Sequence, residues 1–248
     1  LLSLTQTINT TVNNVGFFES ASDALEIQDS TQIIVSSCVM ADSSSDGISL
    51  SGSLSGANTQ INISQCIIKN NGESGIHFIS NSNNIIIDAV NITNSGGGGE
   101  GDAGIQVESN NNTFIQITDS ICNYNQGKGI NTESGSGQIV IQGCTCAFNS
   151  VDGIDYDGVY NVINGCTLSD NGRYGIRGGQ NGVLTNNAIA NNGDDGMSLE
   201  GDNNCVGSGC QMRNNGGNGV GGLSGSNAIL LVLSIEGNAL NGIEIVSG

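Results

Sequence analysis

Three acidic residues occupy the same position in successive copies of a repeated sequence unit, and they are the residues best placed to carry chemistry. Glu108, Glu133 and Asp157 each lie four residues after the glycine that marks their unit. Asp155 and Arg177 lie two residues after the marker glycine of theirs. Stacked carboxylates could supply oxygen ligands to calcium or act as acid and base on a glycosidic bond, with an arginine to stabilise developing charge.

The candidate site residues come from these two positions. The catalytic candidates are Glu133, Asp155, Asp157 and Arg177. Calcium is the one cofactor that the pattern indicates, and it would be held by Glu108, Glu133 and Asp157. The full set of candidate ligand-binding residues is Glu108, Glu133, Asp155, Asp157, Arg177 and Glu200.

Three interpretations of this acidic ladder stay open: a solvated surface, a site for a glycan or calcium, and a catalytic centre. Carboxylates about 4.8 Å apart in water repel each other by only roughly 1 kcal/mol, and by less in salt. The ladder therefore does not require a bound metal. Asp155 and Arg177 also fit a surface ion pair between adjacent strands, which would contribute little stability.

The repeated unit is a glycine followed by an apolar residue, and it recurs along almost the whole chain. Ala24 and Leu25 fit as a weaker first copy. Successive units lie 21 to 29 residues apart, a period typical of solenoids in which each repeat forms one coil. The marker glycines are Gly47, Gly75, Gly104, Gly129, Gly153, Gly175, Gly196, Gly219 and Gly242.

Apolar and polar residues alternate around each marker glycine, which predicts strands rather than helices. The ninth and seventh residues before the glycine are mostly apolar or cysteine, and so are the first and third residues after it. Side chains two residues apart on a strand face the same side, so these positions predict the core. The second and fourth residues after the glycine, which carry the acidic ladder, are expected to face solvent.

An asparagine lies four residues before the marker glycine in seven of the nine units. Asparagine tolerates the left-handed backbone conformation that a tight corner needs, and stacked amides hydrogen-bond from coil to coil. The column therefore predicts an Asn ladder, with exceptions at Ser43 and in an inserted stretch around Glu100. Its members are Asn71, Asn125, Asn149, Asn171, Asn192, Asn215 and Asn238.

The coil length and the Asn-x-x-x-Gly-Ile unit resemble the right-handed parallel β-helix repeat family, which includes pectate lyases, polygalacturonases, phage tailspikes and many surface proteins. The resemblance covers residues 24–248 and implies an all-β fold, a single-stranded right-handed parallel β-helix of about ten coils. In pectate-lyase-like enzymes, catalytic and calcium-binding carboxylates lie on an exposed parallel sheet. No family-specific catalytic motif aligns with this sequence, so the resemblance implies a fold and not one activity.

The charge balance narrows the possible partners. Five Lys and Arg stand against 23 Asp and Glu, a net charge of −18, so binding to nucleic acid or an anionic membrane is not expected without bridging cations. The longest apolar run, 228–235, is too short to span a bilayer. The first residues lack the pattern of a secretion signal. The expected location is extracellular or surface-associated.

His77 is the sole histidine. Its column neighbours, Ser49 and Gln106, supply no acid, so an ordinary surface histidine is expected rather than a Ser-His-Asp arrangement.

The eight cysteines have no zinc-type spacing and fit buried thiols that pack as small apolar groups. Disulfides are the alternative, and the possible pairs are Cys38/Cys66, Cys122/Cys146, Cys144/Cys166 and Cys205/Cys210.

Residues 1–248 are thus predicted to form one β-helix domain, with 1–23 as an irregular first coil or N-terminal cover. Open ends of such a rod present unpaired backbone groups, so the chain is expected to be a fragment or to be covered by a partner or another copy. The predicted function is a structural or binding module of an extracellular, cell-surface or virion-associated protein that self-associates end to end, contacts glycans, or both. The alternative is a polysaccharide lyase or glycoside hydrolase that uses the acidic ladder, with or without calcium.

Overall fold

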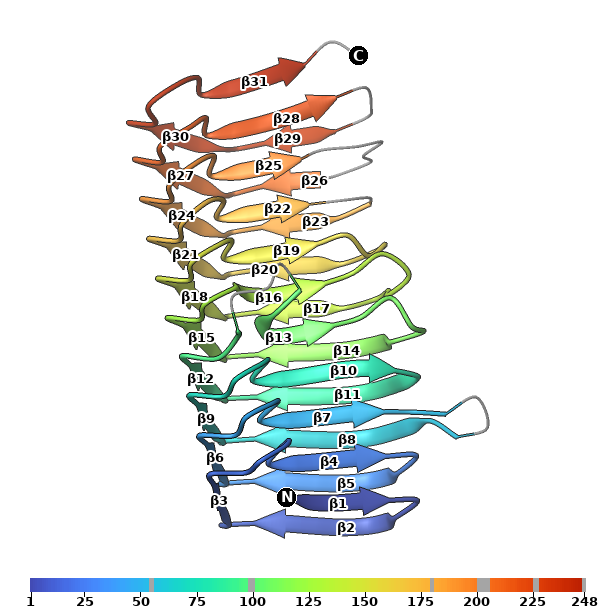
Figure 1. The fold of residues 1–248 in the computed structure, drawn as a ribbon. Helices are drawn as coiled ribbons and strands as arrows, with labels where there is room; N and C mark the ends of the chain where they lie inside the picture. The colour runs from blue at the N-terminus through green and yellow to red at the C-terminus, as the bar shows by residue number, and fades with distance from the viewer. Residues whose placement is uncertain (54–55, 98–100, 179–180, 200–205, 225–227, 247–248) are drawn as a thin grey trace.

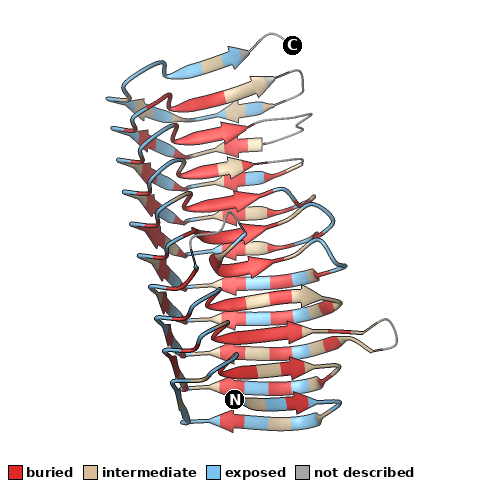
Figure 2. Ribbon diagram, viewed as in Figure 1, coloured by how far each residue is buried: buried red, intermediate tan, exposed pale blue. Residues whose placement is uncertain are grey.

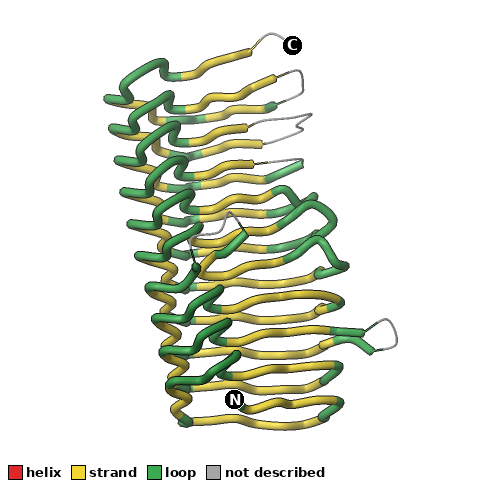
Figure 3. Tube along the Cα trace, in the orientation of Figure 1, coloured by secondary structure: helices red, strands yellow, loops and turns green. Residues whose placement is uncertain are grey.

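The computed structural model shows one chain wound repeatedly through three parallel β-sheets (Figure 1). It describes residues 1–248 except 54–55, 98–100, 179–180, 200–205, 225–227 and 247–248. Each coil contributes one strand to sheet A, one to sheet B and one to sheet C, and each strand pairs in parallel with its counterpart in the next coil. The described residues form strands and loops only (Figure 3). The predicted all-β parallel solenoid of about ten coils is confirmed.

The strands of each sheet follow one another at every third position in the chain. Sheet A contains β1 (Leu2–Thr5), β4 (Leu25–Gln28), β7 (Ile48–Ser51), β10 (Ile76–Ser80), β13 (Ala103–Val107), β16 (Lys128–Thr132), β19 (Ile154–Tyr156), β22 (Ile176–Gly178), β25 (Met197–Leu199), β28 (Val220–Ser224) and β31 (Ile243–Val246). Sheet B contains β2 (Ile8–Asn13), β5 (Thr31–Ser36), β8 (Asn58–Ser64), β11 (Ser82–Asp88), β14 (Thr113–Thr118), β17 (Val140–Gln142), β20 (Val162–Asn164), β23 (Val183–Thr185), β26 (Val206–Ser208) and β29 (Ile229–Leu231). Sheet C contains β3 (Gly16–Phe18), β6 (Val39–Ala41), β9 (Ile67–Lys69), β12 (Asn91–Thr93), β15 (Ile121–Asn123), β18 (Thr145–Ala147), β21 (Thr167–Ser169), β24 (Ala188–Ala190), β27 (Gln211–Arg213) and β30 (Ser234–Glu236).

The core is a column of side chains enclosed by the three sheets (Figure 2). The apolar residues that follow the marker glycines pair in register along sheet A, as Ile76 does with Ile48 on one side and Ile105 on the other. All three are fully buried. The alternation in the sequence therefore identified the inward-facing positions correctly, because a shift of one residue would turn every such side chain outward.

The marker glycines are required by the close approach of successive coils rather than by an unusual backbone angle. A Cβ atom placed on Gly75 would lie 2.6 Å from the carbonyl oxygen of Gly104 in the next coil. The same atom on Gly153 would lie 2.6 Å from the carbonyl oxygen of Gly175. Any side chain at these positions would push the coils apart, which explains why the glycine recurs once per coil.

The first coil is more regular than the sequence indicated. Residues 1–23 were expected to be irregular, yet β1, β2 and β3 each pair in register with β4, β5 and β6. Leu4 and Val12 from this coil belong to the buried core. The sequence has no marker glycine in this coil, but the alternation of apolar and polar residues in β1 and β2 is enough to form strands.

The Asn ladder is confirmed along one corner of every coil from Asn125 onward. The side-chain oxygen of Asn149 accepts hydrogen bonds from both the backbone nitrogen and Nδ2 of Asn125, each at 3.0 Å. The same pattern links Asn171 to Asn192. In the coil with the inserted stretch, the ladder position belongs to Ser95, whose nitrogen donates to Asn125 Oδ1. Each ladder residue thus satisfies buried backbone and amide groups at once.

The left-handed conformation at this corner lies one residue before the one predicted. The ladder asparagines are absent from the residues with positive φ, whereas the residues just before them have φ near +55°. These neighbours include Tyr124 and Phe148, whose rings stack 4.9 Å apart. The asparagines are selected by their buried hydrogen bonds, and the turn itself accepts several residue types.

The cysteines lie inside the coils as free thiols. All seven described cysteines are buried and unpaired, and Cys205 lies outside the described residues. Burial raises the pKa of the Cys66 thiol to about 11. A thiol held protonated in this way packs as a small apolar group and is a poor nucleophile.

Removal of one ladder amide should destabilise the fold without changing its surface. In Asn192→Ala, the backbone nitrogen of Asn171 and the carbonyl of Leu168 lose their partners. Because each unsatisfied buried group costs about 1–3 kcal/mol, we expect a loss of about 3 kcal/mol in the free energy of unfolding, measured by urea denaturation. Asn191→Gly is the matched control, since Asn191 is exposed and has φ of +55°. An equal loss in both variants would contradict a specific role for the ladder.

Candidate functional site

The outer face of sheet A carries most of the predicted site residues, but it is far less exposed than the sequence suggested. The second residue after each marker glycine was expected to face solvent. Most of these side chains are only 2–4% exposed, and the buried members are Ser49, Gln106, Asn131, Asp155 and Ser198. The expectation of a solvated face at this position was therefore wrong.

In several coils, the residue that precedes the marker glycine contributes to this burial. Its side chain reaches across the corner to the second residue after the glycine in the next coil. Asp23 accepts a hydrogen bond from Ser49 at 2.6 Å, and Asn218 donates to Glu244 at 3.0 Å. This contact covers the outer face of sheet A with a second layer of polar side chains.

Asp155 is the centre of the strongest charge cluster on this face. Lys128 Nζ lies 2.7 Å from Asp155 Oδ2, and Arg177 Nη1 lies 3.5 Å from the same oxygen. Asp155 is 2% exposed, and its other oxygen has no hydrogen-bond partner. A buried carboxylate needs this much positive charge because desolvation strongly disfavours an unpaired ion.

A depression of about 410 Å³ opens beside this cluster, lined by Lys128, Val151, Arg173 and Arg177. Three of the five basic residues of the chain thus border one cavity on a protein with a net charge of −18. The guanidinium of Arg173 lies 4.9 Å from the centre of the Tyr174 ring, which orients it. The cavity is therefore a local cationic site on an acidic molecule.

A second depression of about 320 Å³ lies on the other side of Lys128. Asn131, Glu133, Ser134 and Asp157 contribute to its wall. Two of the predicted catalytic residues, Glu133 and Asp157, therefore share a cavity with a lysine. Lys128 Nζ also donates to Asn131 Oδ1 at 3.3 Å, so this amine is held between the two depressions.

His77 forms a second charge centre, lower on the same sheet. Its Nδ1 lies 2.9 Å from Asp46 Oδ2 and its Nε2 lies 2.9 Å from Glu108 Oε1. The prediction that His77 has no acid to orient it was wrong, because both acids lie in other sequence columns. Burial lowers the pKa of His77, but the two carboxylates outweigh it and raise the pKa to about 9. His77 is thus an imidazolium bridging two carboxylates near neutral pH.

Buried amides connect the two centres. Asn131 Nδ2 donates to Gln106 Oε1 at 2.9 Å, and Gln106 Nε2 donates to Glu133 Oε1 at 2.9 Å. Gln106 pairs in register with His77, and Asn131 with Asp155. A continuous polar layer therefore runs across β10, β13, β16, β19 and β22.

The backbone stacks the acidic ladder as predicted, but the side chains diverge. The amide nitrogens of Glu133 and Asp157 each donate to the coil before them, so these residues occupy equivalent positions. Glu108 turns toward His77, however, and Glu133 turns toward Gln106. Across the described ranges, no three His, Cys, Asp or Glu side chains are grouped to hold a metal ion. Calcium binding by the ladder stays a prediction that would require these side chains to turn.

Three of the predicted site residues remain to be placed: Asp155, Arg177 and Glu200. Asp155 and Arg177 are brought together across adjacent strands, as their spacing predicted. Glu200 lies outside the described residues.

The sequence reasoning missed the residues that precede the marker glycines. This column includes Asp46, Lys128 and Asp152. Burial raises the pKa of Asp152, and its Oδ1 accepts a hydrogen bond from the backbone nitrogen of Tyr174. The available signal was that this position, directly before the marker glycine, is charged in several units.

Comparison with known proteins supports the fold. A family described as "Right handed beta helix region" matches residues 2–158 and 152–248. No curated protein sequence matches the chain significantly. No described helix is long and apolar enough to cross a membrane.

Several solved structures share this architecture. The Azotobacter vinelandii mannuronan C-5 epimerase AlgE4 A-module has a TM-score of 0.70 at 12% identity, over 94% of this chain and 80% of that one. PfbA, a surface adhesin of Streptococcus pneumoniae, has a TM-score of 0.56 at 13% identity, over 88% of this chain and 62% of that one. Pectate lyase Pel9A has a TM-score of 0.53 at 13% identity, over 82% of this chain and 61% of that one. Identities this low show the fold and not the activity.

The His77 centre should make stability depend on pH. Since the pKa of His77 is raised from 6.5 to about 9 on folding, its stabilisation is complete below about pH 6.5 and is lost as pH rises through about 9. We expect His77→Gln to lower Tm at pH 6.5 and to match the wild type near pH 10. A difference in Tm that stays constant from pH 6.5 to 10 would contradict the imidazolium bridge.

Proposed function

The chain belongs to the right-handed β-helix family, and we propose that it binds an acidic polysaccharide along the outer face of sheet A. The ligand would be a polyuronate whose carboxylates contact Arg173 and Arg177. The observation that carries this proposal is the gathering of Lys128, Arg173 and Arg177 around one depression of a protein that is otherwise acidic.

The chemistry of the depression favours a carboxylate ligand. Arginine binds carboxylates through paired hydrogen bonds, and both Arg173 and Arg177 border the depression. Acidic residues elsewhere on the molecule repel a polyanion, so attraction is concentrated where the cations lie. Two of the structural neighbours are named for uronate polymers, as a mannuronan epimerase and a pectate lyase. A surface adhesin with the same fold fits the predicted extracellular or surface location.

A catalytic version of this function is favoured by the position of Lys128. Cations that neutralise a uronate carboxylate make the adjacent C–H bond more acidic, and Glu133 or Asp157, which share the second depression with Lys128, could accept that proton while Lys128 stays an ammonium paired with Asp155. Lys128 Nζ borders both depressions and is held by Asp155 at 2.7 Å. Return of a proton to the opposite face of the same carbon would complete epimerisation, whereas cleavage of the bond to the glycosidic oxygen, which leaves with a proton, would complete elimination. Hydrolysis by Asp155 is less well supported, because this carboxylate is buried and already paired.

End-to-end self-association, the other predicted mode of action, stays a prediction. It rests on the general tendency of exposed strand edges to pair. Uniform filaments in negative-stain electron microscopy would support it, and separate short rods at all concentrations would contradict it.

Loss of the two exposed arginines should weaken polyuronate binding. We expect Arg173→Gln/Arg177→Gln to bind polymannuronate and polygalacturonate at least tenfold more weakly in isothermal titration calorimetry, because the ligand carboxylates lose their paired donors. Lys128 remains to pair with Asp155, so the fold should persist. Arg213→Gln is the control, since Arg213 lies on β27 and pairs with Glu236 at 4.0 Å. Equal weakening by Arg213→Gln would indicate only a general charge effect.

The catalytic version has a separate test. Glu133→Gln/Asp157→Asn removes the two carboxylates that could accept the proton and leaves the ion pair between Lys128 and Asp155 in place. If one of these carboxylates is the base, wild-type protein in D₂O should exchange deuterium into the uronate ring, and Glu133→Gln/Asp157→Asn should lose at least 100-fold of that rate with little weakening of binding. NMR of the polymer measures the exchange. No exchange by the wild type would leave a binding protein and remove the enzyme hypothesis.

A further inference from the structure

Sheet B presents a face with a different chemical character from sheet A. Its strands run opposite to those of sheet A in a separate layer, as β7 and β8 show (Figure 1). Among all ten of its strands, the one charged residue is Asp88, whose Oδ1 accepts a 2.6 Å hydrogen bond from Thr118. This uncharged face belongs to a chain with 23 acidic and five basic residues. A charged ligand is therefore not expected on this face.

An aliphatic row forms the middle of this face. Strand register places one outward side chain per coil in line along the rod. Several are well exposed, including Ile86 at 41% and Ile229 at 50%. The row includes Ile86, Val140, Val162, Val183, Val206 and Ile229.

A second row lies two residues earlier on each strand and is built mainly from amides. Every described member has a left-handed backbone, with φ between +54° and +60°. The amide members are Asn9, Gln32, Gln60, Asn84, Gln138 and Asn181. Phe114 and Tyr160 occupy the same row on either side of Gln138.

The two aromatic residues are costly at these positions. A bulky side chain in the left-handed region is strained, whereas asparagine is tolerated there. Burial does not offset the strain, because Phe114 is 52% exposed and Tyr160 is 64% exposed. Tyr124 and Phe148 have similar backbones but stack on each other. Retained strain of this kind points to a function for the exposed rings.

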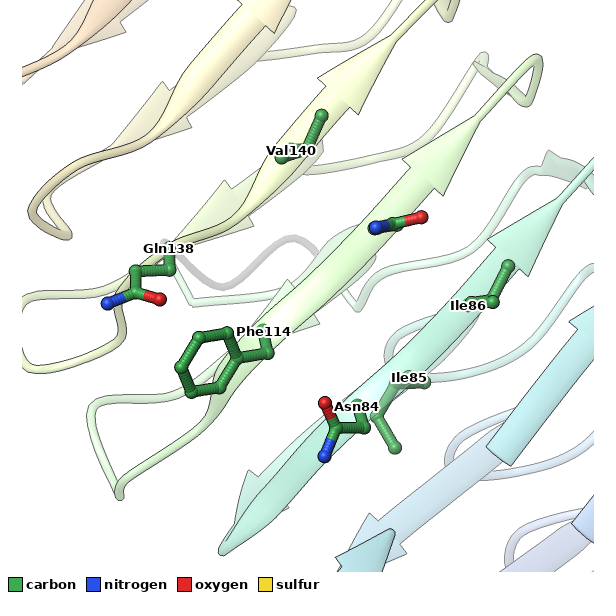
Figure 4. Close-up of a pocket in the computed structure, with 7 residues that line it drawn as sticks. Asn84, Ile85, Ile86, Phe114, Gln138 and Val140 are labelled. Carbon is green, nitrogen blue, oxygen red and sulfur yellow. The ribbon is translucent and has the colours of Figure 1, made fainter. Parts of the chain in front are cut away.

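A shallow cavity of about 370 Å³ surrounds Phe114. Figure 4 shows the ring between the amides of Asn84 and Gln138, with Ile86 and Val140 farther along the two neighbouring strands. Gln116 adds a third amide to the lining. An aromatic ring, an aliphatic floor and several amides, with no charge, suit a ligand that has both an apolar ring face and hydroxyl groups.

We propose that the outer face of sheet B between β11 and β20 binds a neutral, extended polysaccharide. Phe114 and Tyr160 stack on sugar rings, and the amides of Asn84, Gln116 and Gln138 bond the hydroxyls. The two aromatic residues are two coils apart, about 9.6 Å by strand spacing, which is about the span of two sugar rings. The polymer lies along the rod, across the strands. This site is independent of the cationic site on sheet A, so the protein could hold an acidic and a neutral polymer at once.

The test exploits the strain at the two aromatic positions. Phe114→Asn/Tyr160→Asn places the residue that suits a left-handed backbone at both sites, so the variant should have a higher Tm than the wild type. We expect its binding to neutral polymers to fall at least tenfold. The probes are microcrystalline cellulose and chitin in sedimentation assays, and soluble xylan and mannan in affinity electrophoresis. Retention of a neutral polymer by the wild type and its loss in this variant would support the proposal.

Two controls separate this site from others. Tyr124→Asn/Phe148→Asn makes the same change at the stacked pair and should leave neutral binding intact. Arg173→Gln/Arg177→Gln should also keep it, even if polyuronate binding fails. Equal loss in the Tyr124/Phe148 control, or no retention of any of the four polymers by the wild type, would overturn the proposal. A wild-type dimer in analytical ultracentrifugation that Phe114→Asn/Tyr160→Asn dissociates, without glycan binding, would instead identify an interface between copies and also overturn it.

Discussion

Each coil rests on the next at the spacing of two hydrogen-bonded strands, about 4.8 Å, and this contact governs the rest of the molecule. It brings equivalent residues of successive coils side by side, so every position in the repeat becomes a row along the rod. Gly75 and Gly153 are needed because the coils approach too closely for a side chain. The buried hydrogen bonds between Asn149 and Asn171 hold the corner before the glycine in the same place in successive coils.

Stacking of this kind would also place like charges beside each other, and the outer face of sheet A avoids that outcome. Lys128 and Arg177 flank Asp155, and Asp46 and Glu108 flank His77. The sign of the charge thus alternates between neighbouring coils at these two centres. Such pairing is needed because a desolvated ion without a partner is strongly disfavoured. The unsatisfied second oxygen of Asp155 shows that the compensation is incomplete at the centre of the proposed binding face.

The three sheets therefore differ in chemistry although they share one geometry. Sheet A collects the buried ions and two cavities, whereas the strands of sheet B carry aliphatic, amide and aromatic side chains with one carboxylate. A solenoid permits this division because each sheet draws on a different segment of the repeat. Its long faces are independent surfaces for extended ligands, which suits polymers better than small molecules.

The sequence by itself determined the coil, the inward positions, the Asn ladder and the pairing of Asp155 with Arg177, because all of these are relations along a single row. The period fixes which residues stack, and alternation fixes which way they point. Only the tertiary structure decided which rows meet. The contacts of His77 with Asp46 and of Lys128 with Asp155 join two different rows across a corner. Their formation depends on the bend of the backbone and on side-chain rotamers, neither of which appears in a spacing. For the same reason the burial of the outer face of sheet A, and the exposure of Phe114 on sheet B, could not be read from the repeat.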